Sequence, residues 1–224
     1  MKLAIFDFDG TLFPKDTLPF LLKQWYKQNY SKIKLLGVVF PLIPTYLKYK
    51  MVKNTSSDTI NKMRLKAVLG FNQLLAGMTE EEIKRFFSLS SAAIKSQLNP
   101  AVVAKAKKAR REGYHTVLLS GAYLLLLNYI KDFLDFDTVI GSEIYFDQGI
   151  FYNNKTFNIV TGSSKVDKLK TYFKNEDIDW QASLAFADSM IDLQVLELVG
   201  NPTAVCPDPK LLDIALERKW EIIK

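Results

Sequence analysis

The sequence has one cysteine and one histidine among its 224 residues, Cys206 and His115. A lone cysteine excludes an intrachain disulfide framework and is typical of a reducing compartment, so we expect a cytoplasmic protein. A lone histidine excludes a metal site built from several histidines. Both residues lie at the ends of apolar segments that read as strands, so we expect a buried Cys206 and a structural role for His115.

The sequence also lacks a large excess of one charge. It has 30 Lys and Arg against 24 Asp and Glu, a net charge of +6. The densest basic run, residues 105–111, forms one solvated face at helical spacing. Aromatic residues do not interleave with it and no nucleic-acid-binding motif is present, so we expect no nucleic-acid partner. A mildly basic surface would help to attract an anionic substrate.

No apolar run is long enough to span a bilayer. One charge-free stretch, Leu35–Leu47, has thirteen residues, contains Pro41 and Pro44, and is flanked by lysines at positions 32, 34, 48 and 50. We favour a buried helix pair, because the prolines interrupt one continuous helix. The alternative is a contact with a membrane surface, in which the lysines would meet anionic lipids.

Strand patterns alternate with helix patterns over most of the chain. We expect strands at residues 2–7, 114–119, 137–146, 182–187 and 203–206. We expect helices at residues 100–112, 122–133, 165–174, 191–198 and 209–219. This alternation predicts an α/β fold with a doubly wound, mostly parallel sheet covered by helices on both faces. Residues 1–14 and 100–224 would form this core, and residues 142–152 a β-hairpin.

Residues 15–99 differ, because they read as almost entirely helical. Helices are expected at 17–30, 57–69 and 79–95, and the last begins with a capping box formed by Thr79 and Glu82. A helical segment this long after the first strand is not an ordinary connection. It predicts an inserted all-helical cap beside the end of that strand.

The first strand ends in Asp7-Phe-Asp-Gly-Thr11. Open parallel sheets bind ligands at the carboxyl ends of their strands, which is where Asp7 and Asp9 would lie. Two carboxylates this close repel each other unless a cation lies between them or one keeps its proton. The alternative is a solvated Asp-Gly turn.

Other polar residues follow later strands or precede helices, in the order Ser120-Gly121, Lys165, and Asp188 with Asp192. Each could be an ordinary turn, surface or helix-start residue. Together they place four acids, one hydroxyl and one ammonium around one point. Four acids without histidine favour Mg²⁺, and lysine and serine could hold phosphate oxygens. One carboxylate could attack phosphorus and another could move the proton.

These segments resemble the motifs of the haloacid dehalogenase-like hydrolase superfamily. DFDGT is similar to its first motif, LLSGA to its second, Lys165 to its third and ADSMID to its fourth. The helical insertion resembles a type C1 cap, as in the phosphoserine-phosphatase-like subfamily IB. The resemblance covers essentially the whole chain and implies a Rossmann-like core.

The resemblance implies a role for each matched residue. Asp7 would be the nucleophile and a Mg²⁺ ligand through its carboxylate. Asp9 would be the general acid and base and a Mg²⁺ ligand through its backbone carbonyl.

The remaining matched residues would bind the substrate and the metal. Ser120, Gly121 and Lys165 would bind the transferring phosphoryl group. Asp188 would coordinate Mg²⁺, and Asp192 would complete the metal site and support Lys165.

The sequence departs from the phosphoserine-phosphatase pattern in the cap. Asp16 has the spacing of the acid that meets the substrate amine, but Phe71 falls where an arginine for the substrate carboxylate is usual. Arg64 and Arg85 are the only arginines of the cap. An unpaired buried carboxylate is costly, so serine phosphate is not the favoured substrate.

The resulting hypothesis is a Mg²⁺-dependent phosphomonoester hydrolase that acts on a small phosphorylated metabolite through an aspartyl-phosphate. Two alternatives stay open: a phosphatase of a lipid or other apolar phosphate at a membrane surface, and a non-catalytic binding module with this fold. The sequence names neither the leaving group nor an oligomeric state.

Overall fold

The computed structural model describes the backbone of residues 1–51, 57–153 and 159–224. Side chains are described for the same residues except 42, 43, 45–51 and 57–61.

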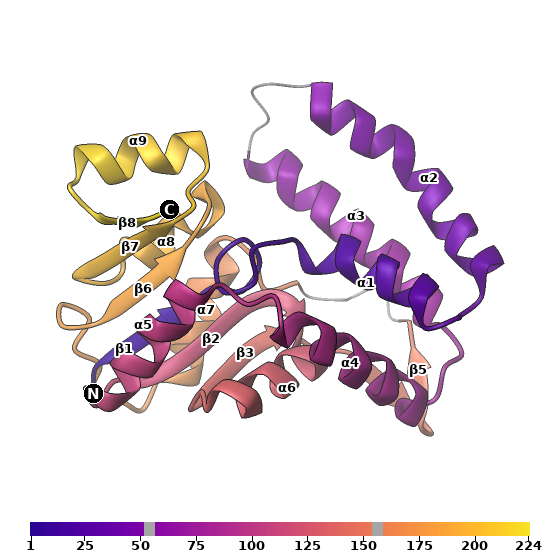
Figure 1. Cartoon of the computed structure of the whole chain (residues 1–224), viewed down its shortest axis with the longest axis horizontal. Helices are drawn as coiled ribbons and strands as arrows, with labels where there is room; N and C mark the ends of the chain where they lie inside the picture. Colours follow the sequence, from indigo (N-terminus) through magenta and orange to yellow (C-terminus); the bar gives the residue numbers. More distant parts are fainter. Residues whose placement is uncertain (52–56, 154–158) are drawn as a thin grey trace.

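A six-stranded parallel sheet forms the centre of the molecule, as the sequence predicts (Figure 1). The strand order is β3-β2-β1-β6-β7-β8. The strands are β1 (Leu3–Phe6), β2 (His115–Tyr123), β3 (Thr138–Ser142), β6 (Leu184–Ala187), β7 (Asn201–Val205) and β8 (Glu221–Ile223). The first strand of the chain therefore lies between β2 and β6, where the order of the strands reverses, which is where such sheets bind ligands.

Helices cover both faces of the sheet, because the residues of β1 alternate between two packed clusters. Ala4 and Phe6 pack with α5 (Pro100–Arg111) and α6 (Leu124–Leu134). Leu3 and Ile5 pack on the other face with the helices that come later in the chain. These are α7 (Ser163–Tyr172), α8 (Leu193–Leu196), which follows the short 3-10 helix η1 (Met190–Asp192), and α9 (Pro209–Glu217).

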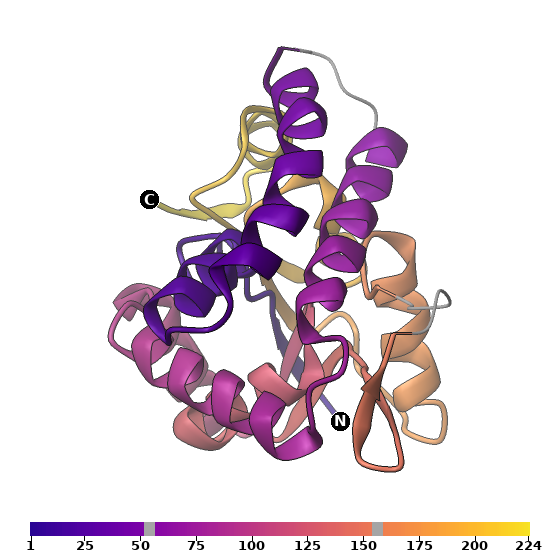
Figure 2. The same ribbon diagram turned by 90° about the vertical axis from the view of Figure 1, so that its right-hand side faces the viewer.

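The segment between β1 and α5 is helical, as predicted. It contains α1 (Thr17–Lys27), α2 (Lys32–Met51), α3 (Ser57–Leu75) and α4 (Glu80–Lys95). The predicted capping box of Thr79 and Glu82 begins α4. Trp25 and Phe86 of these helices belong to the same buried cluster as Phe6 of the sheet, so the core continues from the sheet into the helices. Both views show α2 and α3 side by side, projecting away from the sheet (Figures 1 and 2).

The predicted buried helix pair at residues 35–47 is wrong. One helix, α2, runs through both Pro41 and Pro44. A proline leaves the carbonyl four residues earlier without its donor. Both prolines are exposed, so water can satisfy the freed carbonyls. The side chains of Leu36 and Phe40 are exposed rather than buried, and those of residues 42, 43 and 45–47 lie outside the described part of the structure.

Smaller differences occur at element ends. The strand predicted at 137–146 ends at Ser142 as β3, and the hairpin predicted at 142–152 is confirmed as β4 (Tyr145–Asp147) paired with β5 (Ile150–Tyr152). Strand β8 has no counterpart in the prediction. Cys206 is exposed, with a φ of +41°, because the chain turns there as β7 ends. His115 has the expected structural role, since its Nε2 lies 2.8 Å from Thr138 Oγ1.

Candidate active site

A tight turn carries the two acids of DFDGT away from β1. The peptide N–H of Asp7 donates to the carbonyl of Phe186 in β6 at 2.9 Å, which extends the sheet by one residue. Gly10 has a φ of +76°, and a Cβ added there would lie 2.1 Å from Asp188 Oδ2. Both the backbone conformation and the approach of the Asp188 carboxylate therefore require glycine at this position.

The strand register brings the predicted residues to one edge of the sheet. Phe6 pairs with Leu118 of β2 and with Phe186 of β6. Ser120, within β2, and Asp188, directly after β6, consequently lie one residue beyond the level of Asp7. Parallel pairing thus positions a hydroxyl and a carboxylate on either side of the first acid.

Lys165 connects two of the carboxylates. It lies in the first turn of α7, and its Nζ donates to Asp7 Oδ1 at 2.6 Å and lies 2.7 Å from Asp192 Oδ1. All three side chains are buried. Burial alone would lower the pKa of Lys165, but the charges of Asp192 and Asp7 together raise it above its ordinary value. Lys165 is therefore a fixed positive charge beside Asp7.

Asp7, Asp188 and Asp192 form a compact group of acids. One carboxylate oxygen from each lies within 4.8 Å of the others. Burial raises the pKa of Asp7 to about 6 and that of Asp188 to about 8, and the repulsion among the carboxylates contributes. Three carboxylates and one ammonium leave two negative charges without compensation. One divalent cation would neutralise them, and oxygen ligands suit Mg²⁺, so these residues fit the predicted metal.

Asp9 lies outside this group of acids. Its Oδ1 accepts hydrogen bonds from the backbone N–H of Thr17, at 3.1 Å, and from the Thr17 hydroxyl. Burial raises the pKa of Asp9 to about 7, while the hydroxyl of Thr17 opposes that rise. The carboxyl group can therefore both give and take a proton near neutral pH. Thr17 is the first residue of α1, and the sequence did not single it out.

Ser120 and Gly121 lie in β2 where its pairing with β3 is irregular, and hydrogen bonds fix this part of the strand. The Ser120 side chain is buried, and its Oγ accepts from the N–H of Ala122 at 3.1 Å. Ser142 Oγ donates to the Gly121 carbonyl at 2.8 Å. A Cβ added at Gly121 would lie 3.0 Å from the Val160 carbonyl. These contacts fix the residues that we expect to face a phosphoryl group.

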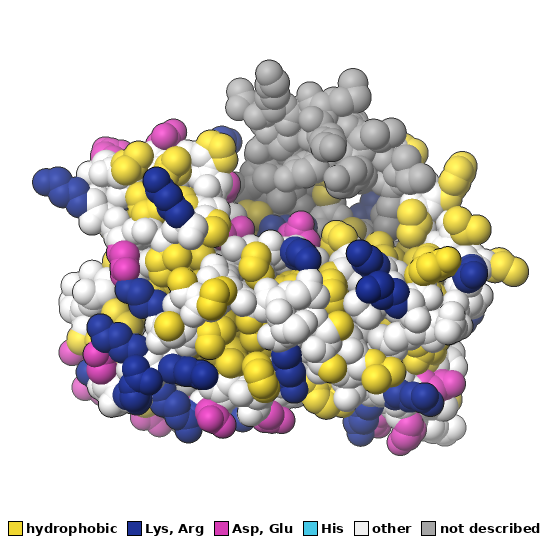
Figure 3. All heavy atoms as spheres, viewed as in Figure 1, with side chains coloured by type: hydrophobic (Ala, Val, Ile, Leu, Met, Phe, Trp, Pro, Cys, Tyr) yellow, Lys and Arg dark blue, Asp and Glu magenta, His cyan; other side chains and the backbone are white. Residues whose placement is uncertain are grey.

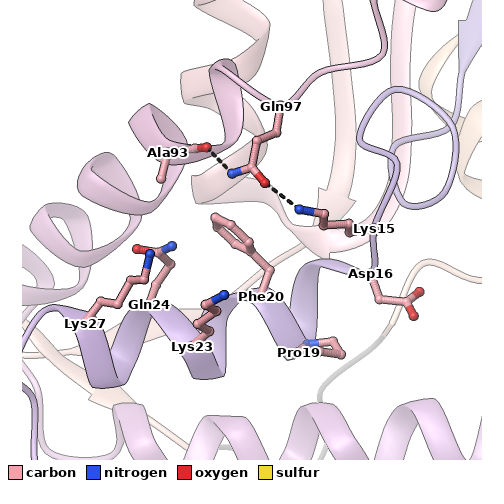
Figure 4. A pocket seen from close by; sticks show the side chains of 9 residues that line it. All are labelled: Lys15, Asp16, Pro19, Phe20, Lys23, Gln24, Lys27, Ala93 and Gln97. Atoms are coloured by element: carbon pink, nitrogen blue, oxygen red, sulfur yellow. Dashed lines mark hydrogen bonds between the residues drawn. The ribbon is translucent and has the colours of Figure 1, made fainter.

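Asp16 stands apart from the other predicted site residues. It is exposed at the start of α1, close enough for its charge to raise the pKa of Asp9. Asp16 lines a cavity of about 470 Å³ beside α1 together with Phe20 and Lys23, although Figure 4 shows its carboxylate directed away from these two side chains. The other predicted acids and the lysine do not line that cavity: Asp7, Asp9, Asp188, Asp192 and Lys165. The cavity is thus not the place where the predicted chemistry would occur.

The helices above the sheet contribute few polar groups. Phe71 is fully buried and its ring lies 5.7 Å from that of Tyr123. The Tyr123 hydroxyl donates to Asn72 Oδ1 at 2.7 Å, a buried link between β2 and α3 that the sequence did not predict. Arg64 of α3 is exposed, and its positive charge opposes the rise in the pKa of Asp188. It is therefore a cation of the cap whose charge reaches the group of acids.

Comparisons with known proteins identify the family. A family model for haloacid dehalogenase-like hydrolases matches residues 4–197, and the chain belongs to that family. A phosphoserine phosphatase from Methanocaldococcus jannaschii is 22% identical over 100% of this chain and 96% of its own length. The inhibition of morphological differentiation protein of Streptomyces azureus is 24% identical over 98% of this chain and 77% of its own length.

Solved structures share the fold. A protein of unknown function from Bordetella pertussis Tohama I superposes with a TM-score of 0.77 at 20% identity, over 100% of this chain and 98% of that one. A phospho-aspartyl intermediate analogue of phosphoserine phosphatase superposes with a TM-score of 0.62 at 19% identity, over 99% and 92%. The predicted family and the predicted fold are confirmed.

Proposed function

We propose that this member of the hydrolase family is a Mg²⁺-dependent phosphomonoester hydrolase that acts through an aspartyl-phosphate on a small phosphorylated metabolite in the cytoplasm. One observation carries the proposal. The buried Asp7 carboxylate contacts the Lys165 ammonium and belongs to a group of three acids. Asp9, whose pKa is raised to about 7, lies in the same turn.

Asp7 and Asp188 would hold Mg²⁺ through their carboxylates, with the Asp9 backbone carbonyl and Asp192 completing the site. When bound, the cation supplies charge neutralisation for the phosphoryl oxygens and for the acids around it. Lys165 and Ser120, with the backbone at Gly121, would hold the remaining phosphoryl oxygens. Their burial matters, because charges act more strongly where water is excluded.

In the first step the Asp7 carboxylate attacks phosphorus. The new bond joins the Asp7 oxygen to phosphorus, and the bond from phosphorus to the substrate oxygen breaks. Protonated Asp9 gives its proton to the leaving alkoxide, which departs as an alcohol. A carboxyl group with a pKa of about 7 is a suitable acid at neutral pH, because a substantial fraction is protonated.

In the second step water attacks the phosphorus of the aspartyl-phosphate. Asp9, now a carboxylate, takes the proton from that water. The bond between Asp7 and phosphorus breaks, inorganic phosphate leaves, and Asp7 returns as a carboxylate. The two hydrogen bonds from Thr17 hold Asp9 Oδ1 in place during both transfers.

The cap does not favour a substrate with a carboxylate next to its phosphate ester. The buried aromatic ring of Phe71 stands where a carboxylate-binding arginine would be expected, and Asp16 is exposed. We therefore infer that phosphoserine is not a preferred substrate. A panel of phosphorylated metabolites, assayed with Mg²⁺, tests this inference, and a strong preference for phosphoserine would contradict it.

The Asp7→Asn variant tests the proposed mechanism. We expect Mg²⁺-dependent turnover of an aryl phosphate to fall by roughly a thousandfold or more, because the amide is a poor nucleophile. Asp167→Asn is the matched control, since Asp167 is exposed on α7 and near Lys165 in sequence. Full activity of Asp7→Asn would contradict the mechanism. Absence of any Mg²⁺-dependent phosphatase activity across the panel would favour the non-catalytic binding module.

A further inference from the structure

The positive charge of the chain is concentrated in the segment from α1 to α3. Residues 17–79 contain ten Lys and Arg and a single acid, Asp58, whereas the rest of the chain contains 20 basic and 23 acidic residues. The basic run of α5 is different, because acids neutralise it. Lys105, Lys108 and Arg110 form ion pairs with Glu221, Glu112 and Asp137, respectively.

An exposed apolar stripe lies on α2 within this positive segment. We define the α2 stripe as Ile33, Leu36 and Phe40, whose exposed fractions are 84%, 67% and 75%. Their spacing places them on one face of the helix. A Cβ added at Gly37, which lies between them, would meet nothing within 4 Å, so this face is open. In Figure 3 hydrophobic side chains gather at the right-hand edge, where the first half of α2 lies.

The opposite face of α2 is already covered. Leu35 and Val38 are partly buried against the main hydrophobic cluster. Helix α2 is thus apolar on two sides, and the described part of the chain covers only one of them. A helix that is apolar all round is normally buried all round. The α2 stripe therefore lacks an apolar partner among the described residues.

Amphipathic and cationic side chains border the α2 stripe. Tyr26 of α1 is half exposed, and Lys32 Nζ lies 5.1 Å from the centre of its ring. Lys27 and Lys34 are exposed nearby in the sequence. Tyrosine and lysine beside apolar side chains are the composition found at membrane–water interfaces, where the ring and the ammonium group meet headgroups.

We propose that the cap docks on an anionic membrane surface through the α2 stripe, with Lys27, Lys32 and Lys34 contacting lipid headgroups. A second copy of this chain is a poorer occupant, because it would bring a second strongly positive surface against the first. Among the described residues no helix has the length and hydropathy needed to cross a bilayer. The contact is therefore interfacial, with apolar side chains inserted and cations above them.

The test measures binding without turnover, so it is independent of the proposed function. The full chain is floated with phosphatidylcholine vesicles that contain or lack phosphatidylglycerol. We expect binding only to the vesicles with phosphatidylglycerol, and release at high salt, because the attraction is largely electrostatic. Equal recovery with both vesicle types, or no binding to either, would overturn the proposal.

Two pairs of variants identify the surface. The triple change Ile33→Ser, Leu36→Ser and Phe40→Ser should weaken binding at least about tenfold, since each side chain loses its insertion into lipid. Leu216→Ser is the matched control, because Leu216 of α9 is 62% exposed but lies far from α2 in Figure 1. Unchanged binding of the triple variant would contradict the assignment to α2.

The second pair of variants tests the role of charge. Lys27 and Lys32 are replaced by glutamine, and this variant is compared with one that carries Lys107→Gln and Arg111→Gln on α5. We expect only the first to lose binding, by roughly fivefold per lysine. Equal losses would show non-specific attraction and overturn the proposal. Far-UV circular dichroism and a cooperative urea unfolding transition confirm that each variant is folded. Sedimentation that shows a dimer broken by the triple variant would instead assign the stripe to self-association.

Discussion

The sheet core and the α1–α3 segment use their polar residues in opposite ways. In the core, Asp7, Asp192 and Lys165 are buried and contact one another. Among the described residues of the α1–α3 segment, most charges are exposed lysines, and α2 also exposes the apolar side chains of Ile33, Leu36 and Phe40. The core therefore positions a few charges for chemistry, whereas the segment presents many charges to something outside the molecule.

This difference assigns the chemical reaction and recognition to different parts of the molecule. The proposed reaction depends on the register of the parallel strands, because it places Ser120 and Asp188 one residue beyond the level of Asp7. Recognition of a substrate or a surface depends instead on side chains of helices, which are not aligned by strand pairing. We expect changes in the core to alter turnover for every substrate, and changes in the α1–α3 segment to alter binding while the chemistry persists.

After Asp7→Asn, the largest effect should follow from Asp9→Asn. An amide cannot transfer the proton, so we expect kcat to fall by about 10²–10⁴ while KM changes little. In the unaltered protein the rate of alkoxide departure should decline as pH rises above about 7, because Asp9 then loses the proton that it must donate. That decline should be absent from the variant. Steady-state kinetics across this pH range provide the measurement, and an unchanged kcat would remove the acid and base role from Asp9.

The next effect concerns the turn after β1. In Gly10→Ala the new Cβ would overlap Asp188 Oδ2, so we expect Mg²⁺ affinity and turnover to fall at least about tenfold, together with stability. Gly113→Ala is the matched control. Gly113 has nearly the same φ, +77°, but an added Cβ there meets nothing within 4 Å. If both variants lose the same activity, backbone strain rather than the contact with Asp188 is the reason that position 10 requires glycine.

These residues also show what could be predicted from the sequence. The four motifs predicted the site because each follows a strand or begins a helix, and parallel sheets bring such ends together. Thr17 was not predicted, since its hydrogen bonds to Asp9 depend on how α1 returns over the turn. The contact between Gly10 and Asp188 joins residues far apart in the chain, and no local pattern records it.

The apolar stretch of α2 illustrates the opposite case. Its composition predicted burial, but burial depends on which neighbours cover each face of a helix. Leu35 and Val38 pack against the main hydrophobic cluster, whereas Ile33 and Phe40 are exposed. A hydrophobic pattern identifies a helix that needs apolar contacts, and it does not say whether this chain supplies them.

A moderate effect should appear in the pH dependence of stability without metal. The pKa values of Asp9 and Asp188 are raised to about 7 and about 8 in the folded protein, against 3.8 for an ordinary aspartate. The folded state therefore binds more protons than the unfolded state between about pH 4 and 8, and stability falls as pH rises through this range.

Urea unfolding in the presence of EDTA at about pH 5 and about pH 8 provides the measurement. We expect a loss on the order of a few kcal/mol toward the higher pH, and Mg²⁺ should restore most of it by neutralising the acids. Asp188→Asn should flatten the dependence, because one raised pKa is removed. Stability that rises with pH in the metal-free protein would contradict the charge balance inferred for the site.

The smallest effect should come from Tyr123→Phe, which removes the buried hydrogen bond from the Tyr123 hydroxyl to Asn72 Oδ1. The amide oxygen of Asn72 is then left buried without this donor, which costs about 1–3 kcal/mol. Because this bond joins β2 to α3, the variant reports whether core and cap unfold together. One cooperative transition at lower urea concentration, by circular dichroism and tryptophan fluorescence, would mean that they do. Two separated transitions would mean that the cap is an independent unit, and turnover of an aryl phosphate should change little in either case.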